Sequence, residues 1–310
     1  MGSPAFAVPS LEALCRSHHE VVAVVTQPDR PKGRRLVLQA PAVKIAAHRL
    51  NLPVLQPATT KNELFMQEVK SFQPDLLVVV AYGEILRPAL IDLAPRGAVN
   101  LHASLLPRYR GAAPIPWAIL HGETVTGATT MLLNEVMDAG DVLLQQECSI
   151  QPTDTTETLT KRVAQLGAPL LLETVDLLEK NEITPKPQDL KSVTYAPKLR
   201  KQDGQIDWNK TASWIARQIR AFDPWPGSFS FYQDLAIKLW LAHPFEGKTA
   251  EKPGTVMNLT KQSLHVACGE GTVLEILEIQ PENRPRLTAA DFIHGYKIHV
   301  GQRFSFTPVS

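Results

Sequence analysis

The sequence predicts a doubly wound, mostly parallel α/β sheet followed by a small, OB-like C-terminal β-barrel. In the first 180 residues, nearly continuous Val and Leu runs such as Glu20–Thr26 and Leu76–Ala81 alternate with helix-like segments. This alternation is typical of a parallel sheet that is covered on both faces. Beyond residue 204, short apolar runs are separated mainly by turn residues, which is typical of a small barrel. A length of 310 residues suits two such domains.

The elements follow from Pro, Ser and Thr helix starts and from apolar runs between turns. We expect an antiparallel strand pair over Thr126–Ile150, joined at Asn134–Asp141. The Pro-containing, polar stretch 183–204 indicates a linker between a catalytic domain at 1–182 and a barrel at 205–310. Helices are expected at 8–18, 41–49, 61–72, 115–121, 155–180 and 210–221, and barrel strands at 227–232, 236–242, 254–258, 263–267 and 272–278.

Composition excludes several classes of protein. No apolar run reaches the roughly 18–20 residues of a membrane span, so no membrane partner is expected. The three cysteines are far apart and form no Cys-x-x-Cys pair, which argues against a disulfide scaffold or a cysteine zinc site. This usage fits a reducing cytoplasm. We expect a monomer that uses no metal.

The sequence Asn100-Leu101-His102 carries the first candidate catalytic residues. It follows the apolar run Gly97-Ala98-Val99, so it lies on a strand. Residues i and i+2 of a strand point to the same face. Asn100 and His102 would therefore direct an amide donor and an imidazole at one spot, where they can stabilise a developing oxyanion.

A carboxylate near His102 would orient the ring and favour its charged form. The segment Asp138-Ala139-Gly140-Asp141 offers two such carboxylates on a tight turn. Considered alone, either aspartate is a hairpin-turn residue, and the choice between Asp138 and Asp141 stays open.

These segments resemble the folate-dependent formyltransferase family, whose signature is Asn-x-His followed by Ser-Leu-Leu-Pro. Asp-x-Gly in that family corresponds to Asp138-Ala139-Gly140, which favours Asp138. The resemblance covers nearly the whole chain, and its later pieces narrow it to members that act on initiator tRNA. The other matching pieces are Gly2–Leu11, Thr26–Pro31, Ser104–Gly111, Tyr195–Leu199, Ile206–Trp208 and Pro224–Gly227.

The resemblance implies a Rossmann-variant catalytic domain that transfers a formyl group from 10-formyltetrahydrofolate to the amino group of methionyl initiator tRNA, for translation initiation. Asn100 would donate to the formyl oxygen, His102 would add a donor or a positive charge, and Asp138 would hold His102 and help move the proton. The apolar members of the folate site are also ordinary core residues when taken singly. The residues implied to contact folate are Ser104, Leu105, Leu106, Pro107, Ile85 and Leu86.

The loop Pro28–Arg35 carries four cations in eight residues, and its Pro and Gly make a stable strand or helix unexpected. The resemblance implies that this loop approaches the tRNA, with Arg34 at the matching position and Arg35 beside it. Without the family it is a solvated loop. Further cations that could meet phosphates lie in the mildly basic C-terminal part, namely Lys198, Arg200, Lys201, Arg217 and Arg220.

Two alternative functions stay open, and the sequence differs from the family pattern at one point. The chain could be another 10-formyltetrahydrofolate-dependent formyltransferase or hydrolase with a non-tRNA substrate, or a non-catalytic RNA-binding protein on this scaffold. The family sheet usually opens with a short strand just before the turn at Gly2-Ser3-Pro4, which this sequence does not contain. We therefore expect an unpaired slot near the middle of the sheet.

Overall fold

The chain divides into two compact units. The computed structural model describes residues 1–32 and 37–307. The first unit comprises Met1–Pro114, Val125–Ser149 and Thr160–Pro197, and the second comprises Ile115–Thr124, Ile150–Leu159 and the chain from Lys198 onward. Residues 183–197, which belong to the stretch expected as a linker, are therefore part of the first unit.

The first unit contains parallel and antiparallel strand pairs. β5 (Leu77–Val79) pairs in parallel with β6 (Ala98–His102), and β7 (Val125–Leu132) and β8 (Val142–Ser149) continue that sheet with antiparallel pairing. A separate parallel pair joins β1 (Val24–Val25) to β4 (Val54–Leu55). The predicted antiparallel pair over Thr126–Ile150 is confirmed as β7 and β8.

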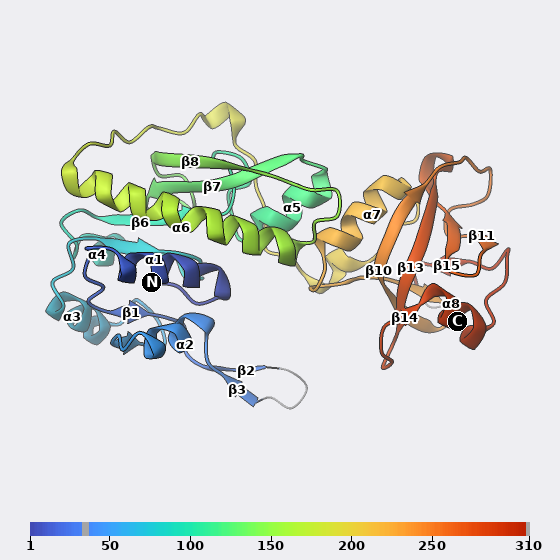
Figure 1. Ribbon diagram of the computed structural model, residues 1–310, viewed down its shortest axis with the longest axis horizontal. Helices are drawn as coiled ribbons and strands as arrows, with labels where there is room; N and C mark the ends of the chain where they lie inside the picture. Colours follow the sequence, from blue (N-terminus) through green and yellow to red (C-terminus); the bar gives the residue numbers. More distant parts are fainter. Residues whose placement is uncertain (33–36, 308–310) are drawn as a thin grey trace. The chain divides into compact units, whose positions relative to one another are not determined.

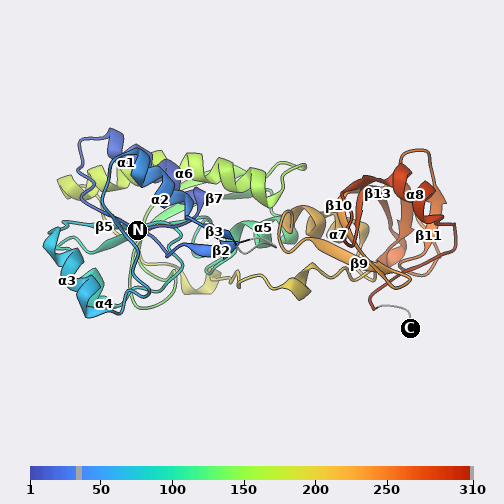
Figure 2. The same cartoon turned by 90° about the horizontal axis from the view of Figure 1, so that it is seen from below.

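Helices cover both faces of these strands, as expected of a doubly wound fold. Figures 1 and 2 show α1 and α6 on one side of the strands, and α3 and α4 on the other. Asn62 caps α3 by accepting a hydrogen bond from the backbone N–H of Leu64. The bounds of the helices in the first part of the chain are α1 Val8–Arg16, α2 Ala42–Arg49, α3 Glu63–Ser71, α4 Pro88–Ile91, α5 Pro114–His121 and α6 Thr156–Lys180.

The strand expected over Glu20–Thr26 is only two residues long. β1 pairs with β4 on one side, and on its other side the N–H of Gly2 donates to the carbonyl of Val25 at 2.9 Å. The Met1 carbonyl accepts a hydrogen bond at 2.9 Å from the N–H of Val80, the residue that follows β5. A cavity of about 450 Å³ adjoins these contacts. Its lining includes residues 19–25 and 72–78. Among the described residues, the ladder of β1 covers only Val24 and Val25.

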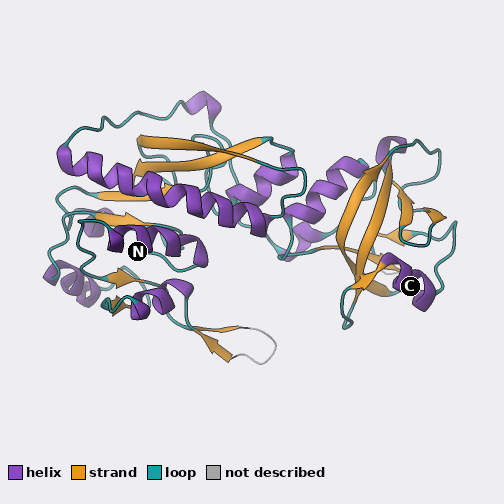
Figure 3. Ribbon diagram, in the orientation of Figure 1, coloured by secondary structure: helices purple, strands orange, loops and turns teal. Residues whose placement is uncertain are grey.

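The basic loop departs from the expectation that it contains no strand. β2 (Arg30–Lys32) pairs antiparallel with β3 (Val37–Gln39), so the described flanks of the loop form a hairpin (Figure 3). The expectation is wrong because proline is tolerated on an edge strand, which lacks a neighbouring strand on one side.

The second unit is a curled antiparallel sheet with strand order β11-β12-β13-β10-β9-β15, and β14 pairs with β13. All five expected strands are present, whereas α8 (Ala289–Tyr296) was not predicted. The core packs Ile215 and Ile219 of α7 and Phe292 of α8 against the sheet. The bounds are α7 Ala212–Ala221, β9 Ser228–Tyr232, β10 Leu235–Phe245, β11 Val256–Leu259, β12 Leu264–Ala267, β13 Val273–Pro281, β14 Leu287–Thr288 and β15 Phe304–Ser305.

Among the described residues, no helix combines the length and the apolar character needed to cross a membrane.

Candidate active site

Strand β6 places Asn100 and His102 on one face of the first unit's sheet. All five of its residues are buried. Leu101 faces the other way, against Gly167 of α6, where an added Cβ would lie 2.8 Å from the leucine side chain. Because side chains alternate along a strand, Asn100 and His102 point away from α6. Within the described part of the chain, no protein group is hydrogen-bonded to the Asn100 amide, which leaves that amide available to a ligand.

His102 is held between a carbonyl and a carboxylate. Its Nε2 lies 2.9 Å from the carbonyl oxygen of Tyr109, and its Nδ1 lies 3.6 Å from Oδ1 of Asp138. A carbonyl only accepts hydrogen bonds, so Nε2 carries a proton. The His102 side chain is 7% exposed and that of Asp138 is 12% exposed, so water screens the pair weakly. The arrangement stabilises positive charge on the imidazole when such charge develops.

Asp138 reaches His102 from a turn with unusual backbone geometry. Its φ of 51° lies in the left-handed region, which an aspartate tolerates better than most residues. Its Oδ2 accepts a hydrogen bond from the N–H of Gly111 at 2.8 Å, which fixes the carboxylate. At Gly140 an added Cβ would lie 1.8 Å from the carbonyl oxygen of Leu132, so the turn has no room for a larger residue.

Asp141, the competing aspartate, has a different part in this turn. Its backbone carbonyl accepts from the N–H of Leu132 at 3.0 Å, which closes the connection between β7 and β8. The carboxylate that pairs with His102 is that of Asp138.

The segment Ser104–Pro107, expected at the folate site, is built around Thr129 of β7. The hydroxyl of Thr129 donates to the carbonyl of Ser104 at 2.6 Å and accepts from the N–H of Leu106 at 3.1 Å. Ser104 and Leu106 are buried, while Leu105 and Pro107 are half-buried. The two residues expected from the loop after β5 also differ in exposure. Leu86 is buried in the apolar core, whereas the Ile85 side chain is 57% exposed.

The cations expected to meet tRNA are placed unevenly. Arg34 and Arg35 lie outside the described residues. Lys198 and Arg200 are exposed, as phosphate contacts require. Arg217 and Arg220 instead donate to backbone carbonyls of their own unit, those of Leu120 at 3.0 Å and Asp154 at 2.8 Å, and burial lowers the pKa of Arg220. These two half-buried arginines are therefore already engaged within the second unit.

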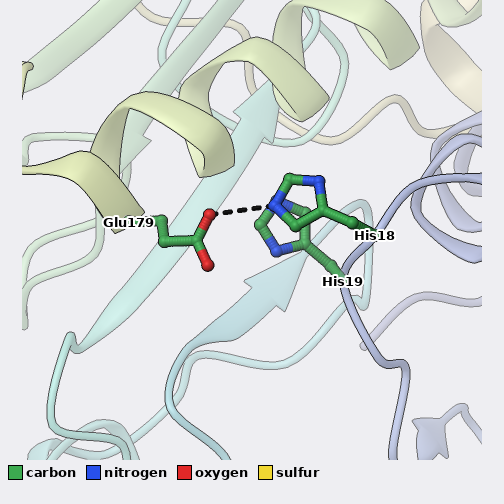
Figure 4. A group of neighbouring side chains, drawn as sticks. All are labelled: His18, His19 and Glu179. Carbon is green, nitrogen blue, oxygen red and sulfur yellow. Dashed lines mark hydrogen bonds and ion pairs between the residues drawn. The ribbon is translucent and has the colours of Figure 1, made fainter.

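One group of described side chains, His18, His19 and Glu179, has the composition of a metal site (Figure 4). Their candidate donor atoms lie within 4.8 Å of one another. Each imidazole already faces a carboxylate, since His18 Nε2 lies 2.9 Å from Glu179 and His19 Nε2 lies 2.7 Å from Asp176. Both carboxylates belong to α6, so these pairs account for the cluster as a link between the end of α1 and α6.

Several residues that build the site were not singled out as candidates. The Tyr109 carbonyl and the Gly111 N–H bind His102 and Asp138 directly. Both belong to the matched stretch Ser104–Gly111, which is a signal that could have found them. Gln188 donates to the backbone carbonyls of Asp138 and Gly140 at 2.9 and 2.7 Å. It lies in the expected linker, where residue type and spacing gave no signal.

The comparisons with known proteins cover both units. Residues 1–175 match the formyl transferase family, and residues 198–297 match the formyl transferase C-terminal domain. The methionyl-tRNA formyltransferase of Syntrophus aciditrophicus (strain SB) is 46% identical over 97% of this chain and 96% of its own. That of Koribacter versatilis (strain Ellin345) is 48% identical over 96% of this chain and 94% of its own.

Solved structures share the fold at lower identity. WlaRD, a sugar 3N-formyl transferase, superimposes with a TM-score of 0.66 at 17% identity, covering 92% of this chain and 97% of its own. HypX from Aquifex aeolicus in complex with tetrahydrofolic acid gives a TM-score of 0.59 at 20% identity, covering 86% of this chain and 45% of its own. With relatives above 40% identity along nearly the full length of both chains, this chain belongs to the formyl transferase family and, within it, to the methionyl-tRNA formyltransferases.

Proposed function

We propose that this enzyme transfers the formyl group of 10-formyltetrahydrofolate to the amino group of methionyl initiator tRNA, in the cytoplasm of a cell with bacterial-type translation. The observation that carries the proposal is the pairing of His102 with Asp138 beside the unengaged amide of Asn100, in a chain with this family membership. Folate use has further support from the fold that the chain shares with the tetrahydrofolate-bound HypX structure.

The reaction joins a nucleophilic amine to a formyl carbon. As the amine nitrogen attacks, the formyl oxygen gains negative charge, and the Asn100 amide donates a hydrogen bond to it. Both ring nitrogens of His102 face protein oxygens, at Tyr109 and at Asp138. The geometry therefore favours His102 as a nearby positive charge that stabilises the oxyanion, over a role as a second direct donor.

The proton balance involves Asp138. The attacking amine must lose one proton, and folate N10 must gain one when its bond to the formyl carbon breaks. Oδ1 of Asp138, on the His102 side of its carboxylate, is the base that takes the proton and passes it on. Oδ2 stays bonded to the Gly111 N–H, so the carboxylate keeps its orientation during the transfer.

The residues proposed to bind folate and tRNA are supported by their exposure and charge. We propose that Ser104, Leu105, Leu106 and Pro107 form one wall of the folate site together with Ile85 and Leu86. The exposure of Ile85 suits direct contact with a ring, whereas Leu86 and Leu106, being buried, shape the wall from behind. Arg34 and Arg35, with exposed Lys198 and Arg200, are proposed to contact tRNA phosphates, and the C-terminal unit is proposed to be the tRNA-contacting domain.

The test supplies 10-formyltetrahydrofolate labelled in its formyl carbon, either with methionyl initiator tRNA, with an amino sugar nucleotide or with no acceptor, and measures the label in formyl-methionine, in the formylated sugar and in free formate. We expect label in formyl-methionine. Label transferred to an amino sugar nucleotide but not to tRNA would indicate a different acceptor, and formate release without an acceptor would indicate a hydrolase. Binding of tRNA with no movement of label would indicate an RNA-binding protein without activity.

A further inference from the structure

The segment that follows α6 is tied to the active-site loops at two points. At its start, Lys186 exchanges two backbone hydrogen bonds of 2.8 Å with Val142, the first residue of β8. Farther on, the Arg110 N–H donates to the carbonyl of Thr194 at 2.9 Å, and the Ala196 N–H donates to the carbonyl of Arg110 at 2.7 Å. Gln188 lies between these two attachments, so the backbone fixes its position on both sides.

The side chain of Gln188 joins a buried arginine to the turn that carries Asp138. Its Oε1 accepts from Nε and Nη2 of Arg110 at 3.0 and 2.7 Å. Its Nε2 donates to the carbonyls of Asp138 and Gly140 at 2.9 and 2.7 Å. Arg110 is only 5% exposed and can donate but not accept, so it fixes which end of the amide faces the turn.

This connection adds bonds from outside the turn to those within it, which run from the Val136 N–H to Asn134 Oδ1 and from the Ala139 N–H to the Val136 carbonyl. Asp138 has a left-handed backbone, with φ 51°, that residues other than glycine adopt at a cost. The Gln188 amide binds the carbonyls on both sides of Ala139, which holds that backbone in place. The same turn conformation directs Oδ1 of Asp138 toward His102 and Oδ2 toward the Gly111 N–H.

We infer that Gln188 is a positioning residue for formyl transfer, which acts by holding the Asp138 turn in the orientation that meets His102. Arg110 is the anchor that orients Gln188. The inference rests on the proposed function, because it assigns Asp138 to the reaction. The segment after α6 would then hold an active-site turn in place, in addition to joining the two domains.

Gln188→Glu is the informative substitution. It keeps an oxygen acceptor for Arg110 and nearly the same shape, but it replaces the two N–H donors by an oxygen that faces two carbonyls. We expect kcat to fall about 10-fold or more, because small displacements of a catalytic group are costly. We expect the KM values for folate and tRNA to change less than about threefold. Gln188→Asn keeps the amide but shortens its reach, and should give a smaller loss in the same direction.

The matched control is Gln218→Glu in the second unit. Gln218 is buried, and its Nε2 donates to the carbonyls of Asp203 and Gln205 at 3.2 and 3.0 Å. Like Gln188, it therefore binds two backbone carbonyls of one loop through its amide nitrogen. This variant should lose stability, while the kcat of its folded fraction stays within about twofold of the parent value.

Two readouts separate positioning from a general loss of structure. If Gln188 acts through Asp138, then Gln188→Glu added to Asp138→Asn should lower kcat by less than about twofold further. Hydrogen exchange at the Gly111 amide, which bonds Asp138 Oδ2, should be faster in Gln188→Glu and unchanged in Gln218→Glu.

The inference is overturned by parental kcat in Gln188→Glu, by a full multiplicative loss in the double variant, or by unchanged Gly111 exchange. If the unsubstituted enzyme transfers no formyl group, the proposed function fails instead. In that case the exchange rate at Gly111 still tests whether Gln188 holds the turn.

Discussion

Asp138 and His102 come from different parts of the chain and meet at nearly buried positions, with Oδ1 of the carboxylate 3.6 Å from Nδ1 of the imidazole. The histidine is fixed at the end of β6, and the aspartate is carried by the turn between β7 and β8. Because β7 is antiparallel to β6, this turn starts near the beginning of β6 and must fold back over the sheet to reach His102. The turn thus determines where the carboxylate lies.

Asp138→Asn should lower kcat by about 10²-fold, whereas Asp141→Asn should change it by less than about threefold. The amide of asparagine cannot stabilise a cationic imidazole or accept the amine proton. Asp141 contributes its backbone carbonyl to the turn, and that group is retained in asparagine. Single-turnover rates of both variants at saturating folate measure the difference. The opposite ranking would assign the role to Asp141.

Gly140→Ala should lower the free energy of unfolding by about 1–3 kcal/mol. The new Cβ would lie 1.8 Å from the carbonyl oxygen of Leu132, whose N–H is bonded to the Asp141 carbonyl, so the backbone cannot move away easily. Activity of the folded protein should fall as well, since the same turn carries Asp138.

Gly295→Ala is the control for that substitution. Gly295 lies in α8 with no atom within 4 Å of an added Cβ, so alanine should be neutral or stabilise by about 0.5–1 kcal/mol. Urea unfolding monitored by circular dichroism compares the two variants. Equal stability of both would mean that the turn is more adaptable than its contacts indicate.

Arg34→Ala should weaken productive tRNA binding while folate affinity stays unchanged. The loop that carries Arg34 holds four cations in eight residues, which suits contact with a phosphate backbone. Loss of one such contact should reduce the log–log dependence of kcat/KM on salt by about one unit. A salt series with charged tRNA measures this slope, and Lys70→Ala, which removes an exposed cation of the first unit, is the control. An unchanged slope would mean that the loop is only a solvated connection.

The three thiols should differ in reactivity with a disulfide reagent at pH 8. Burial raises the pKa of Cys268 to about 12, and Cys148 is also buried, so neither should react before unfolding. Cys15 is partly exposed, and partial burial raises its pKa, so it should react slowly. Cys15→Ser should remove the reaction of the folded protein. A native signal that survives in Cys15→Ser would show that one of the buried thiols is accessible.

The elements with strong sequence periodicity could be predicted, and so could the catalytic strand. β6 was recognisable because an apolar run ends in Asn100 and His102, and alternation along a strand alone places both on one face. The helices α1, α2, α3, α6 and α7 were recognisable from their starts and apolar spacing. Both signals are local, so they do not need knowledge of the tertiary structure.

The parts that could not be predicted depend on contacts between distant segments. The length of β1 depends on how much of it pairs with β4, which is distant in the sequence, and the run Glu20–Thr26 does not reveal this. Gln188 has no periodic neighbours and pairs with residues about 50 and 78 positions earlier in the chain. The left-handed backbone of Asp138 is a consequence of the bonds around it, so its sequence neighbours predict a turn but not the direction of the carboxylate.

The most direct test of this account is the single-turnover rate of formyl-methionyl-tRNA formation by Asn100→Ala and His102→Ala, at saturating folate and charged tRNA. We expect each variant to be slower than the parent enzyme by about 10²-fold or more, because each substitution removes a group that stabilises the oxyanion. Folate affinity should change only a few-fold, and exposed Asn258→Ala and His299→Ala should retain the parental rate. Rates near the parental value in both Asn100→Ala and His102→Ala would contradict the assignment of this strand face to formyl transfer.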